Sequence, residues 1–324
     1  MWQTSAERLA LLELLVRGTL KKRRAQAVVW DALAELPWVK RTGRRDELGI
    51  VNARRSELVA LLERVWPEWA DGLATLTARG LPPTPDGWAA LEDALRAEGL
   101  PELPVRLNRR TAAALVAPHS KAALTERRLA ALGDAEATHD GSVRLRPPKG
   151  LVATTVMGSV DLAAVAAVLG EVSLPERALK NRLSLDGPVR AVLLIENLGA
   201  FCDLAMLDGW LYAHVGGWDT ATVVQLLERL PQTPVIHFGD LDPNGVRIYH
   251  HLRAIRPDLH WFVPAFWAEF VEAKGHLGAW PDDLDLHDAP ELVRVLATRA
   301  LWLEQEPIAI DTRTAAALES ILSR

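Results

Sequence analysis

Three acidic residues stand directly after apolar runs in the second half of the chain. Glu196 follows RAVLLI. Asp240 directly follows PVIHFG, and Asp242 stands two residues further on. Apolar runs of this length are typical of buried strands in a parallel sheet, and groups that follow such strands meet at one edge of the sheet. Mg²⁺ usually binds one or two carboxylates together with water and phosphate oxygens. The pattern therefore favours chemistry that uses a divalent cation.

The spacing of Asp240 and Asp242 fits a shared ligand pair. In an extended chain, side chains two residues apart point to the same side, so both carboxylates can reach one cation. The segment DLDPNG has a structural interpretation as well, because an acid after a strand is often a helix cap and the pattern D-x-D-P-N-G is often a turn or a Ca²⁺-type loop.

A glycine pair, Gly216 and Gly217, follows the apolar run GWLYAHV. Glycine backbone can approach a phosphate closely, and the free N–H groups of the next helix, TATVVQLLERL, would favour an anion. We expect Asp219 to cap this helix. The glycine pair is therefore a candidate phosphate-binding element.

From Val189 onward, predicted strands alternate with predicted helices. Strands are expected at 190–196, 209–215, 234–240 and 260–265. This alternation predicts a parallel sheet flanked by helices, with functional groups at the carboxyl ends of the strands.

The N-terminal half has a different pattern. Residues 5–17 have helical periodicity, residues 37–51 read as two strands around a basic turn, and another helix begins near residue 53. Helices followed by a basic hairpin favour an α+β winged-helix region, with Arg41, Arg44 and Arg45 as candidate DNA phosphate contacts. The alternative is a small cap with a solvated charged turn.

The chain is long enough for two or three domains. LPPTP at 81–85 reads as a connector, 144–150 as a turn and 174–188 as a linker. We therefore predict a winged-helix-like domain at 1–80, a helical extension and linker at 81–185, and a catalytic domain at 186–324.

Charge is divided unevenly along the chain. Residues 186–324 hold 10 Lys and Arg against 20 Asp and Glu, whereas residues 1–185 hold 27 against 22. A basic part joined to an acidic part could pair a DNA-gripping module with a metal-binding module. Ordinary compositional scatter explains the same numbers.

Cysteine content and hydropathy bear on location. The single cysteine, Cys202, excludes an internal disulfide framework and a Cys-rich zinc site, which favours a reducing, cytoplasmic location. The first residues lack a basic start followed by an unbroken apolar core, and no run of about 18 apolar residues occurs. We expect neither a signal peptide nor a membrane span.

Taken jointly, Glu196, Gly216-Gly217 and Asp240-x-Asp242 with their strand context resemble the Toprim fold of topoisomerases, primases and nucleases. LLIENLGAF, VGGWDT, HFGDLDPNGVRIYHHL and the late LWLEQE further resemble the C-terminal domain of the JetD family, the nuclease subunit of Wadjet plasmid-defence systems (also described as MksG-type). That family is related in fold to the A subunit of topoisomerase VI. The similarity covers roughly residues 185–310, and the N-terminal half is compatible with a CAP-like winged helix.

The resemblance implies a Mg²⁺-dependent endonuclease, with Mn²⁺ able to substitute, that cleaves plasmid or invading double-stranded DNA. It also implies a homodimer and an SMC–kleisin partner complex. Glu196, Asp240 and Asp242 would be the catalytic metal ligands. The late acids Glu304 and Glu306 would bind a second metal if their segment returns to the site, although a solvated helix end is an equal alternative.

Two other functions stay open at this point. One is a strand breaker of the topoisomerase VI A type, which needs a tyrosine nucleophile on the winged helix. The only tyrosines are Tyr212 and Tyr249, both in the second half, so hydrolysis by activated water is favoured. The other is a non-catalytic DNA-binding module.

His237, inside an apolar run, is predicted to be a core histidine with satisfied hydrogen bonds.

Overall fold

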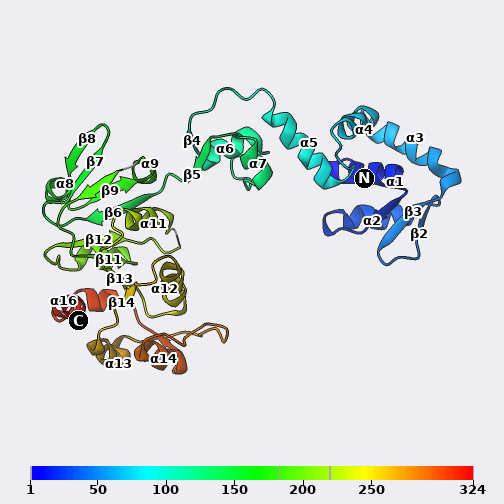
Figure 1. The fold of residues 1–324 in the computed structure, drawn as a ribbon. Helices are drawn as coiled ribbons and strands as arrows, with labels where there is room; N and C mark the ends of the chain where they lie inside the picture. The colour runs from blue at the N-terminus through cyan, green and yellow to red at the C-terminus, as the bar shows by residue number, and fades with distance from the viewer. Residues whose placement is uncertain (1, 182, 219, 324) are drawn as a thin grey trace. The chain divides into compact units, whose positions relative to one another are not determined.

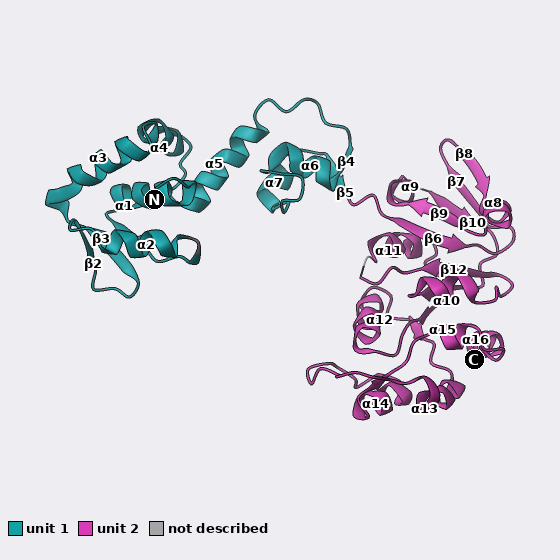
Figure 2. Cartoon of the chain, turned by 180° about the vertical axis from the view of Figure 1, so that it is seen from behind, with its two compact units in different colours: residues 1–138 teal, residues 139–324 magenta. Residues whose placement is uncertain are grey.

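The computed structural model describes residues 2–181, 183–218 and 220–323. The chain divides into two compact units, unit 1 (Met1–Thr138) and unit 2 (His139–Arg324) (Figure 2). Asp219, the expected cap of the helix after the glycine pair, lies outside the described residues. Among the described residues, no helix combines the length and the apolar character that a membrane crossing requires.

Unit 1 alternates helices with short strands. Its elements are α1 (Ser5–Arg17), β1 (Thr19–Lys21), the 3-10 helix η1 (Arg24–Gln26), α2 (Ala27–Ala34), β2 (Val39–Arg41), β3 (Glu47–Ile50), η2 (Asn52–Arg54), α3 (Arg55–Val65), α4 (Trp69–Ala78), α5 (Pro85–Ala97), β4 (Arg106–Asn108), α6 (Arg109–Val116), α7 (Glu126–Ala130) and β5 (Glu136–Thr138).

The first 65 residues form one small core. Strands β1, β3 and β2 pair antiparallel in that order, and side chains from α1, α2 and α3 pack against them, among them Leu14, Trp30 and Leu58. The predicted first helix and the predicted hairpin at 37–51 are confirmed. Gly18 ends α1 in the left-handed conformation, φ 73°, which glycine adopts without a steric cost.

Unit 2 contains the longer strands. Its elements are β6 (Ser142–Arg146), β7 (Val152–Thr155), β8 (Gly158–Asp161), α8 (Leu162–Leu169), β9 (Val172–Pro175), α9 (Glu176–Lys180), β10 (Ser184–Asp186), β11 (Ala191–Ile195), α10 (Leu198–Asp203), β12 (Trp210–His214), α11 (Ala221–Glu228), β13 (Val235–Phe238), α12 (Pro243–Ile255), β14 (His260–Trp261), η3 (Ala265–Phe270), α13 (Val271–Lys274), β15 (His276–Leu277), α14 (Glu291–Thr298), β16 (Leu301–Trp302), α15 (Glu306–Ala309) and α16 (Thr314–Ile321) (Figure 1).

A six-stranded mixed sheet forms the centre of unit 2, in the order β14-β13-β11-β12-β6-β9. The four strands predicted from Val189 onward are confirmed and run parallel. Strand β6 extends the sheet antiparallel to β12, and β9 pairs antiparallel with β6. The α/β class with a helix-flanked sheet is therefore confirmed, with a mixed rather than a purely parallel sheet.

The division of the chain differs from the expected one. The segments read as a turn at 144–150 and as a linker at 174–188 contribute β6, β9 and α9 to unit 2. Because β6 pairs with β12 of the central sheet, the expected boundary at 185 falls inside unit 2, and the chain divides instead after Thr138.

The order of connections creates a crevice in the sheet. From β11 the chain crosses to β12 on one side, and from β13 it crosses to β14 on the other side. Parallel crossovers are nearly always right-handed, which puts α10 on one face and α11 and α12 on the opposite face. Connections that leave neighbouring strands in opposite directions open a crevice at their carboxyl ends. In unit 2 this crevice lies between the ends of β11 and β13.

Candidate active site

Glu196 and Asp240 occupy the crevice because each follows one of the two strands that border it. The backbone N–H of Glu196 donates to the carbonyl oxygen of Phe238 at 3.1 Å, which continues the strand pairing to the edge of the sheet. The side chain of Glu196 is buried, with 9% exposed, and that of Asp240 is half-buried. The parallel register of β11 and β13 thus brings the two acids together, as the sequence predicts.

Gly239 allows the close packing of Glu196. A Cβ atom at this position would lie only 2.6 Å from Oε2 of Glu196, so any other residue would displace the carboxylate. The glycine requirement here is one of space rather than of backbone conformation.

Asp242 serves the helix that follows it. Its side chain accepts a hydrogen bond from the backbone N–H of Gly245 at 2.6 Å and caps α12, whose first residue is Pro243. One oxygen of Asp242 thus caps a helix, as the structural interpretation of DLDPNG expects. The carboxylate still acts on Glu196 and Asp240 electrostatically, since its charge raises the pKa of both.

The late segment LWLEQE returns to the crevice. Leu303 pairs with Leu241 through two backbone hydrogen bonds of 2.9 and 3.2 Å, and the backbone N–H of Gln305 donates to Asp240 at 2.8 Å. This pairing brings Glu306 to the acids. Glu304 instead faces His276 at 3.9 Å and is exposed, so only one of the two candidate late acids joins the site.

Asn197 is a site residue that the motifs did not indicate. Its Nδ2 donates to both carboxylate oxygens of Asp240, each at 3.0 Å, and to Oε2 of Glu306 at 3.3 Å. The amide therefore sits between two carboxylates and offsets part of their repulsion. Its only signal in the sequence is its position directly after Glu196.

Gln305 connects the carboxyl ends of β11 and β13. Its side chain is fully buried. With the amide oriented to satisfy both ends, it donates to the carbonyl of Phe238 at 3.2 Å and accepts from the backbone N–H of Asn197 at 3.1 Å. The late segment thus holds both edges of the crevice.

The carboxylates repel one another in a poorly solvated place. Burial is the main cause that raises the pKa of Glu196 to about 8, and the charges of Asp240, Asp242 and Glu306 raise it further. Burial also raises the pKa of Asp240 to about 6, although N–H groups of Gln305 and Asn197 lower it in part. A bound cation would relieve this repulsion.

The chemistry of this donor set suits Mg²⁺. It is composed of hard oxygen atoms, and Oε2 of Glu196 is buried with no hydrogen-bond partner among the described residues. In the described part of the chain, no three His, Cys, Asp or Glu side chains already converge as a closed metal site. Mg²⁺ needs only one or two carboxylates and keeps several waters, so the residues present fit it.

The glycine pair lies beside the start of α12. Gly217 has φ 61°, and no atom lies within 4 Å of a Cβ built there, so its backbone is open. The next residue, Trp218, donates from Nε1 to Oδ1 of Asn244 at 2.9 Å, which links this loop to the first turn of α12. A phosphate-binding role for Gly216 and Gly217 stays a prediction.

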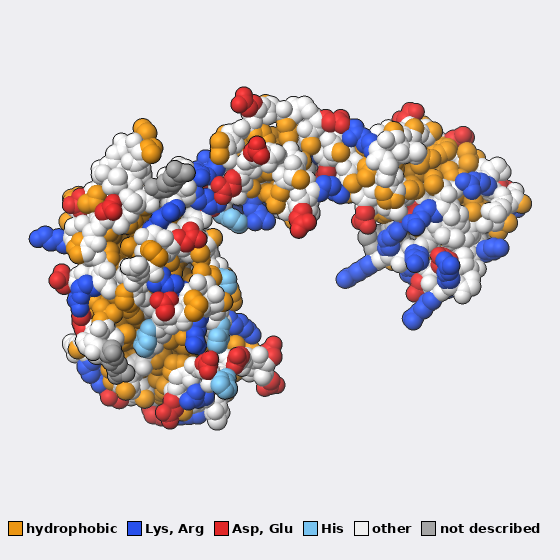
Figure 3. All heavy atoms as spheres, viewed as in Figure 1, with side chains coloured by type: hydrophobic (Ala, Val, Ile, Leu, Met, Phe, Trp, Pro, Cys, Tyr) orange, Lys and Arg blue, Asp and Glu red, His pale blue; other side chains and the backbone are white. Residues whose placement is uncertain are grey.

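The predicted DNA contacts lie in unit 1. Arg41 ends β2, and Arg44 and Arg45 form the turn to β3 with 80% and 96% of their side chains exposed. Figure 3 shows Lys and Arg side chains gathered on this part of unit 1. Their exposure is what phosphate contact requires, and their contact with DNA stays a prediction.

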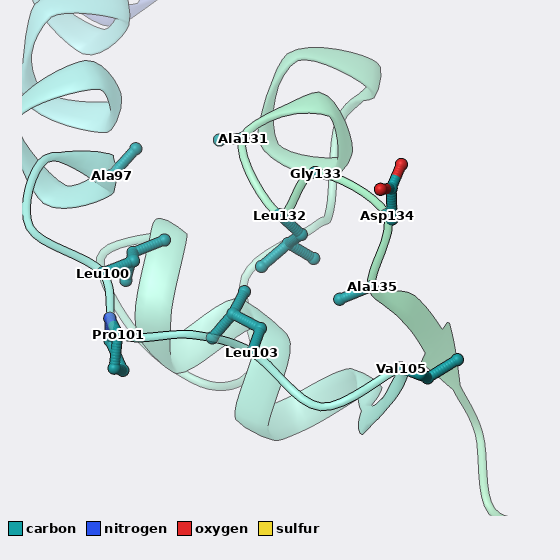
Figure 4. A pocket seen from close by; sticks show the side chains of 10 residues that line it. All are labelled: Ala97, Leu100, Pro101, Leu103, Val105, Ala131, Leu132, Gly133, Asp134 and Ala135. Atoms are coloured by element: carbon teal, nitrogen blue, oxygen red, sulfur yellow. The ribbon is translucent and has the colours of Figure 1, made fainter.

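A pocket of 420 Å³ in unit 1 has no cluster of acidic side chains among the residues that line it (Figure 4). Leu103 and Leu132 fill its centre, and its only titratable side chain, Asp134, points away from them. The acidic crevice of unit 2, where Glu196, Asp240 and Glu306 come together, is the candidate active site.

Residues 149–262 match the family model described as Wadjet protein JetD, C-terminal. The matched segment contains β11 and β13 with Glu196, Asp240 and Asp242, and it ends before Gln305 and Glu306. No curated protein is significantly similar to the chain. This part of unit 2 is thus similar to the C-terminal part of the Wadjet protein JetD.

The raised pKa of Glu196 predicts a pH-dependent stability of the cation-free protein. The folded state keeps a proton on Glu196 up to about pH 8, whereas the unfolded state loses it near 4.5. Because the folded state binds more protons between these values, stability falls as pH rises through this window. Glu196→Gln should flatten the fall and raise the unfolding temperature of unit 2 by about 2 °C or more at pH 8.

Thermal unfolding of the wild type and the variant at pH 5 and pH 8, in a chelator, measures this effect. Added Mg²⁺ should stabilise the wild type more at pH 8 than at pH 5. Equal pH dependence in Glu196→Gln and the wild type would contradict the electrostatic account of the crevice.

Proposed function

We propose that the protein is a Mg²⁺-dependent DNA endonuclease that acts as the nuclease subunit of a Wadjet-type defence complex. The observation that carries this proposal is the crevice of Glu196, Asp240, Asp242 and Glu306 within a unit that matches the JetD C-terminal model. Mn²⁺ would substitute for Mg²⁺, because both accept the same oxygen ligands.

The acids would divide the work of phosphodiester hydrolysis. Bound Mg²⁺ supplies positive charge that stabilises the reacting phosphate and the leaving oxygen. Asp240 and Glu196 would hold it, with Asp242 and Glu306 adding negative charge or water-mediated contacts. Alternatively, Glu196, whose pKa is raised to about 8 in the cation-free crevice, would take up or release a proton there instead of binding the cation.

Burial of both tyrosines supports hydrolysis over tyrosine-linked strand transfer. The hydroxyl of Tyr212 donates to the carbonyl of Ala205 at 2.8 Å, and that of Tyr249 to the carbonyl of Leu259 at 3.5 Å. Burial raises the pKa of both phenols. Neither hydroxyl is free to attack a phosphate.

The fold assignments belong to the same proposal. The four parallel strands with Glu196 and Asp240 at neighbouring ends support a Toprim domain in unit 2. The order helix, strand, helix, hairpin in residues 5–50 supports a winged-helix, CAP-like region. By resemblance to the family, we propose a cytoplasmic homodimer that works with an SMC–kleisin complex.

Removal of the crevice acids should abolish cleavage. Glu196→Ala and Asp240→Ala take away charge that stabilises the transition state, which is expected to cost several kcal/mol, or a rate loss of about 10³-fold or more. Asp242→Ala should have a similar or milder effect on chemistry, because water can replace one ligand. Conversion of supercoiled plasmid with Mg²⁺, with Mn²⁺ and with chelator measures the rates.

Glu304→Ala is the matched control, because this acid is near in sequence but faces His276 and should keep wild-type activity. Near-normal cutting by folded Glu196→Ala protein would refute the site. A wild-type protein that binds DNA but never cuts it would favour the non-catalytic DNA-binding alternative.

The basic turn should carry DNA binding. Replacing Arg41, Arg44 and Arg45 together with Ala removes three phosphate contacts, so affinity should fall for all sequences alike and the slope of log affinity against log salt should become shallower by about 2 to 3. Fluorescence anisotropy with duplex DNA at several salt concentrations tests this. Full binding by the triple variant would show that another surface holds the DNA.

Cleavage products should carry free ends and no attached protein. The reason for this prediction is that Tyr212 and Tyr249 are buried. Denaturing electrophoresis of labelled DNA would reveal a covalent adduct, and Tyr212→Phe and Tyr249→Phe should cut as the wild type does. An adduct that disappears in either variant would overturn hydrolysis and favour the topoisomerase-like mechanism.

A further inference from the structure

A fully buried histidine lies directly behind the crevice. His237 is in β13, with 0% of its surface exposed, and neither ring nitrogen has a hydrogen-bond partner among the described residues. The expected burial is confirmed, but the expected satisfied hydrogen bonds are absent. An unpaired buried polar group destabilises the folded state, so a polar ring at this position needs a reason.

A second unpaired atom lies beside the same glycine. Oε2 of Glu196 is buried and has no partner among the described residues. A Cβ atom at Gly239 would lie 2.6 Å from this oxygen and 2.6 Å from Nε2 of His237. The two atoms therefore border one small space, which only the glycine leaves open.

The two atoms have complementary chemistry. A neutral imidazole carries one N–H, which donates, and an oxygen of a carboxylate, or the carbonyl oxygen of the protonated acid, accepts. Burial lowers the pKa of His237 to about 4, so the ring is neutral near pH 7 and brings no unpaired charge into the core. The ring is within 6.1 Å of that of Tyr249, whose hydroxyl donates elsewhere, so the tyrosine does not compete for Nε2.

The two atoms are not hydrogen-bonded in the structure. We propose that a small rotation of either side chain beside Gly239 lets Nε2–H of His237 donate a hydrogen bond to Oε2 of Glu196, and that His237 is thereby a positioning residue for the crevice. The bond would fix one oxygen of Glu196 against the sheet and direct the other toward the site. Ligating carboxylates commonly depend on such hydrogen bonds behind them. The catalytic consequence rests on the proposed nuclease function, whereas the hydrogen bond does not.

The hydrogen bond is tested first without any cation. In the full chain labelled with ¹⁵N-histidine, the signal lost in His237→Gln identifies His237. We expect a neutral ring protonated at Nε2, with this proton protected from exchange, and we expect it to shift and exchange faster in Glu196→Ala. A ring protonated at Nδ1, or an Nε2–H signal indifferent to Glu196→Ala, would overturn the proposal.

The positioning role is tested by cation affinity, using Mn²⁺ alone as the probe. His237→Leu should weaken Mn²⁺ binding by about 10-fold or more, because Glu196 loses its orientation. His237→Gln, whose Nε2 can donate from nearly the same place, should recover most of the affinity. Tyr249→Phe is the matched control for a disturbed core on the other side of the ring and should bind as the wild type does.

The outcomes separate this inference from the proposed function. Wild-type Mn²⁺ affinity in His237→Leu overturns the positioning role, whatever the activity of the protein. Should His237→Leu unfold, the comparison of His237→Gln with the wild type and the NMR signal still decide. A normal hydrogen bond in a wild-type protein that cuts no DNA would count against the nuclease and not against His237.

Discussion

Electrostatic repulsion among carboxylates at a poorly solvated strand edge is the constraint on which unit 2 depends. Burial and like charge both oppose ionisation of Glu196 and Asp240. The protein tolerates this cost with a small number of N–H groups directed at Asp240, from Asn197 and Gln305. Such local frustration is typical of a functional site, since a structural position would be filled more stably by apolar residues. The surrounding sheet supplies the compensating stability through fully buried strands.

The sequence allowed the central part of this arrangement to be predicted. The run before Glu196 is apolar throughout and the short run before Asp240 is interrupted only by His237, because β11 and β13 are covered on both faces by helices. Parallel strands place their carboxyl ends at one edge, so convergence of the two acids followed from strand identity alone. The basic hairpin of unit 1 was also predictable, because it depends on local turn residues.

The remaining parts depend on contacts between distant segments. Strands β6 and β9 are short, β6 is followed by Pro-Pro-Lys-Gly and β9 ends in a proline, so nothing local distinguishes them from loops before β6 pairs with β12 and β9 pairs with β6. The separation of Glu306 from Glu304 depends on the pairing of Leu303 with Leu241. Asn197 acquires its role only when Asp240 and Glu306 lie on either side of it. Periodicity and residue type carry no information about such long-range register.

The same pairing of Leu241 with Leu303 has a consequence for the order in which the protein is made. A chain emerging from the ribosome folds from its N-terminal end, and β11, β12 and β13 can begin to associate once they have emerged. Asp240 receives its N–H from Gln305, and the fourth carboxylate is Glu306, so the crevice is not complete until this late segment has been synthesised. Nascent chains that stall earlier hold the first three acids without the segment that arranges them. An unfinished polypeptide therefore lacks the complete acidic centre.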